Sequence, residues 1–192
     1  MSRTFLTFAA AVSACISLVG AASAKPAAPT QNITKTAASL PQFSTLVSLL
    51  KQSKLAGALT AKGPYTVFAP TNAAFKNLEA AVPGVTKALT NPMNKGLLVQ
   101  VLKYHVLASK VMAADAVAAA KKNAKVPTLL GKNANGQIAL SLKGGKVALS
   151  DSAGLNTAIV TKTNLAASNG VVHVINKVIV PKSVATALQK AA

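Results

Sequence analysis

The sequence predicts an α+β fold, with helices mainly in the first half of the chain and strands mainly in the second. Apolar residues recur at helical spacing before residue 122, and short alternating or β-branched runs follow residue 125. Strand and helix signals do not alternate along the chain, which disfavours a doubly wound βαβ sheet. The length of 192 residues favours a single domain.

The first helical signal lies within residues 36–59. Apolar residues recur at spacings of three and four from Phe43 to Leu50, which marks one face of an amphipathic helix. Gly57 and the Gly63-Pro64 pair interrupt this pattern. The helical region is therefore expected to end before residue 65.

A short strand and a second helix are expected next. Residues 65–69 form a β-like run that ends at Pro70. Thr71 is then a suitable N-cap, because its hydroxyl oxygen can accept a hydrogen bond from a backbone N–H of the first turn. We expect the helix to continue to Leu78, with Phe75 turned to the core.

Two further helices complete the first half. Asn91-Pro92 opens a helix whose apolar face carries Leu98 and Val101, and proline suits its first turn. The chain is expected to extend through residues 104–106. Residues 113–122 are alanine-rich and predict a helix.

The second half reads as strands joined by tight turns. Asn135-Gly136 and Gly144-Gly145 are turn dipeptides. The strongest strand signal is the β-branched run that ends at Pro181, and a short helix is expected to follow it. The expected strands cover residues 126–130, 137–142, 146–149, 156–160 and 170–180, and the terminal helix covers residues 184–190.

The first 24 residues have the layout of a secretory signal peptide. A basic start is followed by an apolar stretch and a small-residue cleavage site, so we expect cleavage after Ala24. Lipoprotein processing at Cys15 is a second, less favoured reading, because the residues after it stay apolar. A flexible tether over residues 25–31 and a single domain over residues 32–192 would remain. The expected location is secreted, periplasmic or on the cell surface.

The charge of the chain is strongly unbalanced. Arg3 is the only arginine, so cleavage of the leader leaves 20 lysines against three acids, a formal charge of +17. Such a field attracts polyanions in general. Arginine, whose planar fork reads phosphates and bases, is absent from the mature sequence, and aromatic residues for base stacking are scarce. Specific nucleic-acid recognition is therefore disfavoured.

The residues that carry catalysis or bind metals are also few. His105 and His173 are the only histidines, both within apolar sequence, and Glu79, Asp115 and Asp151 are the only acids. Acid–base and nucleophilic catalysis both need such groups to converge. We expect no enzyme activity, no metal site and no cofactor, and we interpret both histidines as structural.

Three segments together resemble the fasciclin-like family of adhesion modules. Residues 63–75 (GPYTVFAPTNAAF) look like its first signature, residues 102–107 (LKYHVL) like its central Tyr-His element, and residues 169–181 (NGVVHVINKVIVP) like its second signature. They occur in the family order and at family-like spacing, and the resemblance covers about residues 32–190, nearly the whole mature chain. The residues that match the signatures, all interpreted as structural, are Thr66, Phe68, Pro70, Thr71, Asn72, Phe75, His105, Gly170, His173, Asn176 and Pro181.

The resemblance implies a compact α+β wedge, with a small sheet core flanked by helices, that binds partners at cell surfaces or in matrix without catalysis. Many family members carry aspartate where this chain has Asn72 and Asn176. An amide still accepts hydrogen bonds and can also donate them. The fold is therefore expected to survive, whereas cation binding at either position is disfavoured.

Two groups of residues are candidates for contact with a partner. The resemblance points to Tyr104 and His105, although their apolar surroundings favour burial. The basic run Lys121, Lys122 and Lys125 can grip an acidic glycan or an anionic membrane surface, or it can be a solvated helix end.

These features predict a secreted or cell-surface binding module whose partner is a cell-surface or matrix protein or an acidic glycan. The alternative is a periplasmic carrier of a small apolar ligand or lipid, held between helices and sheet. The apolar content of 51% allows such a cavity, but no sequence feature marks one.

Overall fold

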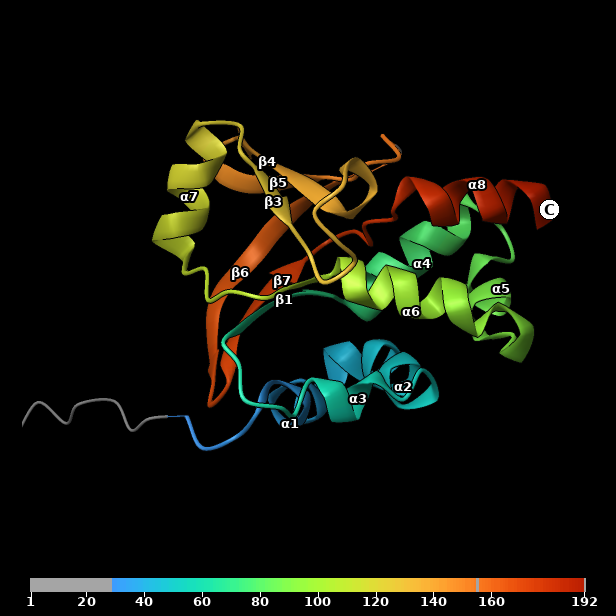
Figure 1. The fold of residues 1–192 in the computed structure, drawn as a ribbon, viewed down its shortest axis with the longest axis horizontal. Coiled ribbons are helices and arrows are strands. Elements are labelled where there is room, and N and C mark those ends of the chain that lie inside the picture. Colours follow the sequence, from blue (N-terminus) through green and yellow to red (C-terminus); the bar gives the residue numbers. More distant parts are fainter. Residues whose placement is uncertain (1–28, 155, 192) are drawn as a thin grey trace, which may run out of the picture.

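The structure is a computed structural model that describes residues 29–154 and 156–191. The expected signal peptide, the lipoprotein alternative at Cys15 and the first residues of the expected tether lie outside the described residues. Figure 1 shows helices in the first half of the chain and most strands in the second, as predicted.

A seven-stranded mixed sheet organises the described chain, in the order β2-β1-β7-β6-β5-β4-β3. Neighbouring strands are antiparallel except for β1 and β7, which run parallel. The strands are β1 (Tyr65–Pro70), β2 (Val106–Leu107), β3 (Lys125–Pro127), β4 (Gln137–Lys143), β5 (Lys146–Ser150), β6 (Thr157–Ala167) and β7 (Gly170–Ile175).

Helices cover both faces of the sheet (Figure 1). The helix α7 packs on β4 and β5, whereas α4 packs on β1, and α1 contacts β6 and β7. The helices are α1 (Ile33–Ala38), α2 (Ser44–Gln52), α3 (Leu55–Ala58), α4 (Asn72–Ala81), α5 (Val85–Thr90), α6 (Lys95–Tyr104), α7 (Ala113–Lys121) and α8 (Lys182–Ala191). Short 3₁₀ turns cover Pro41–Phe43, Pro92–Asn94 and Ala134–Gly136. No helix in the described part of the chain is long and apolar enough to cross a bilayer.

The central strands β1 and β7 are buried on both faces, because the sheet separates two apolar clusters. Val67 and Val172 face the larger cluster beneath α1–α6 and α8. Phe68 and Ile175 face the smaller cluster beneath α7. A strand buried on both faces needs apolar residues at consecutive positions, which explains the β-branched run in β7.

The predicted helix over residues 36–59 is divided into several shorter elements. Pro41 opens a 3₁₀ turn, and its ring cannot donate a backbone hydrogen bond. Lys54 adopts a left-handed conformation (φ 60°) that separates α2 from α3. The helix α5 was not predicted; it is a short helix after Gly84, which is also left-handed (φ 81°).

Strand lengths also differ from the prediction: the predicted strand 126–130 is the shorter β3 (Lys125–Pro127), and two other strands differ more. The predicted strand 156–160 continues to residue 167 as β6. Its second half carries exposed polar residues and bulges, so it lacks the regular alternation of apolar and polar residues that predicts a strand. The predicted strand 170–180 stops at Ile175, because the side chain of Asn176 accepts a hydrogen bond from Ile159 N (2.7 Å). Val178–Val180 are buried without strand pairing to a neighbour.

Gly170 sets the close approach of β7 to β1. It pairs with Tyr65, and a Cβ at this position would collide with the Tyr65 carbonyl oxygen, which belongs to rigid backbone. Replacing Gly170 with alanine should therefore force the two strands apart and lower the free energy of unfolding by about 3 kcal/mol.

Urea denaturation of the Gly170→Ala variant measures this loss. Gly96→Ala is the matched control, because a Cβ there meets no atom within 4 Å and lies in α6. The control should be neutral or more stable by up to about 1 kcal/mol. Equal stability of the two variants would show that the strands have room to adjust.

Candidate binding site

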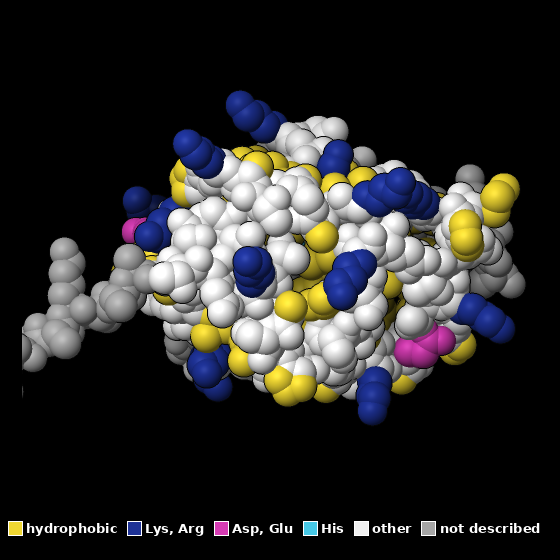
Figure 2. All heavy atoms as spheres, turned by 90° about the horizontal axis from the view of Figure 1, so that it is seen from below, with side chains coloured by type: hydrophobic (Ala, Val, Ile, Leu, Met, Phe, Trp, Pro, Cys, Tyr) yellow, Lys and Arg dark blue, Asp and Glu magenta, His cyan; other side chains and the backbone are white. Residues whose placement is uncertain are grey.

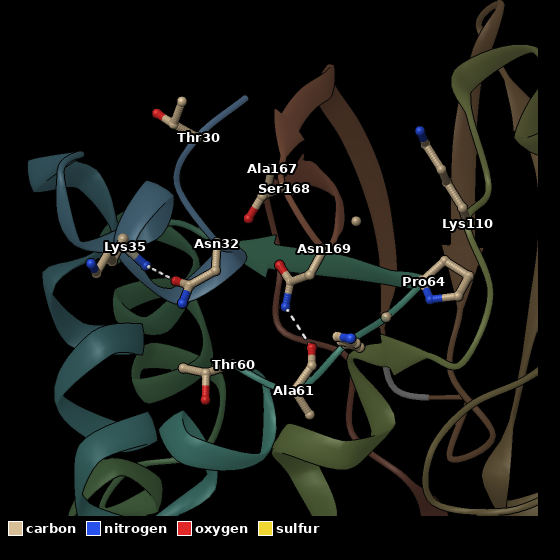
Figure 3. A pocket seen from close by; sticks show the side chains of 13 residues that line it. Thr30, Asn32, Lys35, Thr60, Ala61, Pro64, Lys110, Ala167, Ser168 and Asn169 are labelled. Carbon is tan, nitrogen blue, oxygen red and sulfur yellow. Dashed lines mark hydrogen bonds between the residues drawn. The ribbon is translucent and has the colours of Figure 1, made fainter. Parts of the chain in front are cut away.

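An open cleft of about 630 Å³ lies at the N-terminal end of the β1–β7 pair. Three walls form it, namely the start of α1, the loop before β1 and the turn between β6 and β7, and Lys110 borders it from the loop after β2. Figure 3 shows these walls around Asn169, with Lys35 and Lys110 on opposite sides. This volume is within the range of small-ligand sites, about 300–1,000 Å³.

Asn169 holds the three walls together. Its Oδ1 accepts a hydrogen bond from Ile33 N (3.0 Å), and its Nδ2 donates to Leu59 O (2.7 Å) and Ala61 O (3.1 Å). The Asn169 carbonyl also accepts from Tyr65 N (3.1 Å). One side chain therefore ties α1, the loop before β1 and the β6–β7 turn into one surface.

Lysines supply the charge of the cleft. Lys35, Lys62 and Lys110 line it, together with the hydroxyls of Thr60 and Ser168 and the amide of Asn32, and no acidic residue of the described chain does. Ammonium and hydroxyl groups can donate hydrogen bonds to carboxylate or sulfate oxygens. The arrangement can therefore hold an anion, and an elongated one can contact lysines on both sides.

The acids of the described chain are engaged elsewhere. Glu79 accepts hydrogen bonds from Gly84 N (2.7 Å) and Thr86 N (2.8 Å), and the hydrogen bonds from Thr86 and then Gly84 lower the pKa of its carboxyl group. Asp115 accepts from Met112 N (3.0 Å) at the start of α7. Asp151 is buried and accepts from Val180 N (3.3 Å).

Lysines are spread widely over the surface. Figure 2, which views the molecule from the side of α1–α3, shows them scattered over that face with few acids among them. Lys121, Lys122 and Lys125 are exposed at the end of α7 and the start of β3. They lie outside the cleft, and Lys125 borders a separate hollow of about 260 Å³ beside Asp151.

Tyr104, a candidate for partner contact, is buried in the structure. Its side chain is 0% exposed, and its hydroxyl donates to Gln137 O (2.7 Å) and accepts from Ser152 N (2.9 Å). Burial raises the pKa of this phenol. As folded, the side chain joins α6 to β4 and the β5–β6 loop and is not available to a surface partner.

His105, the neighbouring candidate, is 2% exposed. Its Nδ1 lies 2.8 Å from Val101 O, and its Nε2 lies 3.3 Å from Ile179 N. Because Ile179 N can only donate, Nε2 accepts and Nδ1 donates, which defines a neutral tautomer. Burial lowers the pKa of this imidazole to about 4. The ring therefore caps α6 and anchors the segment after β7.

His173 has an equivalent role on β7. Its Nε2 lies 2.9 Å from Val111 O, its Nδ1 accepts from Asn164 N (3.4 Å), and its ring stacks on Phe68 at 5.8 Å between centroids. Burial lowers the pKa of this imidazole too. The same loop is held by Thr66, whose hydroxyl donates to Ser109 O (2.6 Å) and accepts from Val111 N (2.8 Å). These contacts fix the loop that carries Lys110.

The other signature residues lie along β1, β7 and α4. Thr71 caps α4, since its hydroxyl accepts from Ala74 N (3.3 Å), as the sequence predicted. Thr66, Phe68, Pro70, Phe75, His105, Gly170, His173 and Pro181 are buried, Thr71 and Asn72 are half-buried, and Asn176 is exposed.

Asn72 uses both ends of its amide. Its Oδ1 accepts from Thr45 N (3.1 Å), and its Nδ2 donates to Pro41 O (3.0 Å) and Ser44 Oγ (2.9 Å). A carboxylate could not donate to Pro41 O, so asparagine suits this environment better than aspartate. Asn176 is used only as an acceptor in its contact with Ile159 N, a role that either residue can fill.

The residues that build the cleft were not identified from the sequence as binding residues. Lys35, Lys62 and Lys110 are far apart along the chain and belong to no motif. Asn169 stands within the second signature, beside the glycine that pairs with β1. The polar residue before such a glycine is a signal that could have identified Asn169, but no comparable signal marks the lysines.

No three histidine, cysteine, aspartate or glutamate residues come together as a metal site within residues 29–154 and 156–191. The two histidines use their ring nitrogens for backbone groups, as described above. The groups that remain able to bind a ligand in the cleft are the ammonium and hydroxyl groups described above.

Comparison with known proteins agrees with the architecture. The model of the Fasciclin domain family matches residues 41–181 of this chain. The chain belongs to the fasciclin domain family. The resemblance seen in the three sequence segments is thereby confirmed, and the family consists generally of non-enzymatic binding domains.

Two similar proteins come from Synechocystis sp. Protein sll1483 is 41% identical over 149 residues, which cover 78% of this chain and 73% of that protein. The uncharacterised protein sll1735 is 33% identical over 150 residues, covering 77% of this chain and 96% of that protein.

A solved structure shows the same fold at low identity. A pair of FAS1 domains from the insect cell adhesion molecule Fasciclin I superposes with a TM-score of 0.70 and 17% sequence identity. The match covers 81% of this chain and 53% of that chain, so this fasciclin protein spans about half of the insect domain pair.

The buried, neutral His105 makes the stability of the fold dependent on pH. Its pKa rises from about 4 in the folded state to the ordinary 6.5 on unfolding. The unfolded state then binds more protons between these values, so stability is full above pH 6.5 and falls as the pH decreases toward 4. The expected loss is about 3 kcal/mol.

Denaturant titrations at several pH values test this, with the His105→Gln variant as the comparison. The variant should be less stable at pH 7, and its stability should depend less on pH between 6.5 and 4. Parallel profiles for the two proteins would assign the acid sensitivity to other groups.

Asn169 should be needed for the shape of the cleft. Replacement by alanine removes three side-chain hydrogen bonds and should lower the free energy of unfolding by about 2 kcal/mol. Thermal unfolding measures the loss, with Asn77→Ala, an exposed position on α4, as the control. If both variants melt alike, Asn169 does not tie the walls together.

Proposed function

We propose that this fasciclin protein is an extracellular binding module, secreted, periplasmic or held at the cell surface, that recognises an acidic glycan through the lysine-lined cleft. The observation that carries the proposal is the cleft itself, which lysines border on two sides and whose described lining residues include no acid. The family contributes the binding role, since fasciclin domains are generally non-enzymatic binding domains.

The chemistry of the cleft favours a glycan over a flat protein surface. Its walls are rich in hydroxyl, amide and ammonium groups, contributed by residues such as Thr30, Asn32 and Ser168. These groups can hydrogen-bond both the hydroxyls of a sugar and its carboxylate or sulfate. The positive field of the whole surface would then raise the association rate with a polyanion.

A folded, hydrogen-bonded site costs little to organise on binding. Lys35 and Asn32 lie at the start of α1, where Asn32 Oδ1 accepts from Lys35 N (2.9 Å). Lys110 lies on a loop held by Thr66 and His173. Preorganised walls lose less conformational entropy when a ligand binds, which favours a defined partner over general attraction.

The test is glycan binding by a variant that loses only the cleft charges. The triple variant Lys35→Gln, Lys62→Gln, Lys110→Gln should bind a carboxylated or sulfated oligosaccharide about tenfold more weakly, at roughly half a kilocalorie for each exposed contact. Isothermal titration at physiological salt measures the affinity.

A matched control separates the cleft from the overall charge. Lys87→Gln, Lys95→Gln, Lys146→Gln removes the same charge from exposed positions elsewhere. It should keep the affinity within about threefold, since exposed charges are screened over roughly 8 Å at this salt concentration. Equal losses in both triple variants, or binding that vanishes at physiological salt, would leave only nonspecific attraction and refute the proposal.

A further inference from the structure

A second hollow lies between the helices α4, α5 and α8. It has a volume of about 280 Å³ and mostly apolar walls. Val85 and Leu188, from α5 and α8, are 2% and 8% exposed and line it together with Leu78 of α4. The remaining lining residues are Ala81, Val82, Asn156, Val180 and Ala185.

A smaller hollow of about 150 Å³ adjoins this one. The two share the lining residues Leu78, Ala81 and Asn156, and together they are called the groove. The smaller hollow also has two polar lining residues, Asn77 and Lys177, that the larger one lacks. The groove is therefore amphipathic along its length, with an apolar end beneath α8 and a cationic end at Lys177.

The acids near the groove are held by backbone groups. Glu79 of α4 is bound to Gly84 N and Thr86 N. Asp151 accepts hydrogen bonds from Asn156 N (3.2 Å) and Val180 N (3.3 Å) and is 7% exposed. Lys177 is exposed and is the one cation among the described residues that line the groove.

We infer that this groove binds a free single-chain carboxylate amphiphile, a fatty-acid-like molecule. The alkyl chain lies between Leu78, Val85 and Leu188, and the carboxylate lies at Lys177. The apolar lining of the larger hollow suits one alkyl chain, and Lys177 in the smaller hollow suits one anionic head. The two hollows together are near the lower end of small-ligand volumes, about 300 Å³, which is too small for a two-chain lipid.

The groove is independent of the lysine-lined cleft. The cleft lies beside α1 and the β6–β7 turn, whereas the groove lies by α5 and α8 at the opposite end of the molecule (Figure 1). The two sites share no lining residue. Binding of an amphiphile therefore succeeds or fails whatever happens to glycan binding.

Isothermal titration with dodecanoate, kept below its micelle concentration, tests the inference, with dodecan-1-ol as the uncharged comparison. Dodecanoate should bind more tightly than the alcohol. Shorter acids should bind more weakly, by roughly fourfold for each methylene removed, because each loses buried apolar surface.

Two substitutions locate the site. Ala81→Phe fills the groove where its two parts meet, and should weaken dodecanoate binding at least tenfold. Ala80→Phe, an exposed neighbour on the same helix that does not line the groove, should not. Because both positions are exposed, both variants should fold, and thermal unfolding checks this.

The head group is tested at Lys177. Lys177→Gln should weaken dodecanoate about threefold, as expected for an exposed charge pair, and leave dodecan-1-ol unchanged. Lys87→Gln, on α5 outside the groove, is the control. The absence of dodecanoate binding, equal affinity for the acid and the alcohol, or an Ala81→Phe variant that binds like the native protein would each overturn the inference.

Discussion

The parallel pairing of β1 with β7 is the contact on which the rest of the structure depends. It joins residues 65–70 to residues 170–175, more than 100 positions later in the chain. Closing so long a loop is entropically costly, and burial of both strands on both faces offsets that cost. Gly170 permits the close approach, and Asn169 extends the connection to α1. The cleft is the solvent-facing end of this pairing.

Buried polar side chains fix the loops that the pairing leaves irregular. Tyr104, His105 and His173 each bond backbone groups from segments far apart in sequence, and no buried side-chain nitrogen or oxygen of the described residues lacks a partner. All three are neutral near pH 7, because burial disfavours their charged forms. Positive charge, by contrast, lies at the surface, where most lysines of the described chain are exposed.

Local chemistry made much of the fold predictable from sequence. Short-range signals predicted three elements correctly: Thr71 caps α4, apolar spacing marks α2, and a β-branched run marks β7. Each signal depends only on residues close together in the sequence. Features set by distant contacts were missed. Asn176 ends β7 because of a bond to Ile159, and β6 continues past residue 160 because bulges let it follow β7. The cleft lysines come together only through the fold, so no spacing in the sequence could reveal them.

Both proposed sites combine the shared core with segments that flank it. The fasciclin match covers residues 41–181, whereas α1, with Lys35, precedes it and α8, with Leu188, follows it. The cleft takes one wall from α1, and the groove takes one wall from α8. The core fixes the positions of the remaining walls through the β1–β7 pair and α4. Ile33 of α1 and Leu188 of α8 belong to the core itself, so a change that alters one site and leaves the packing intact has to fall on an exposed residue of these helices, such as Lys35.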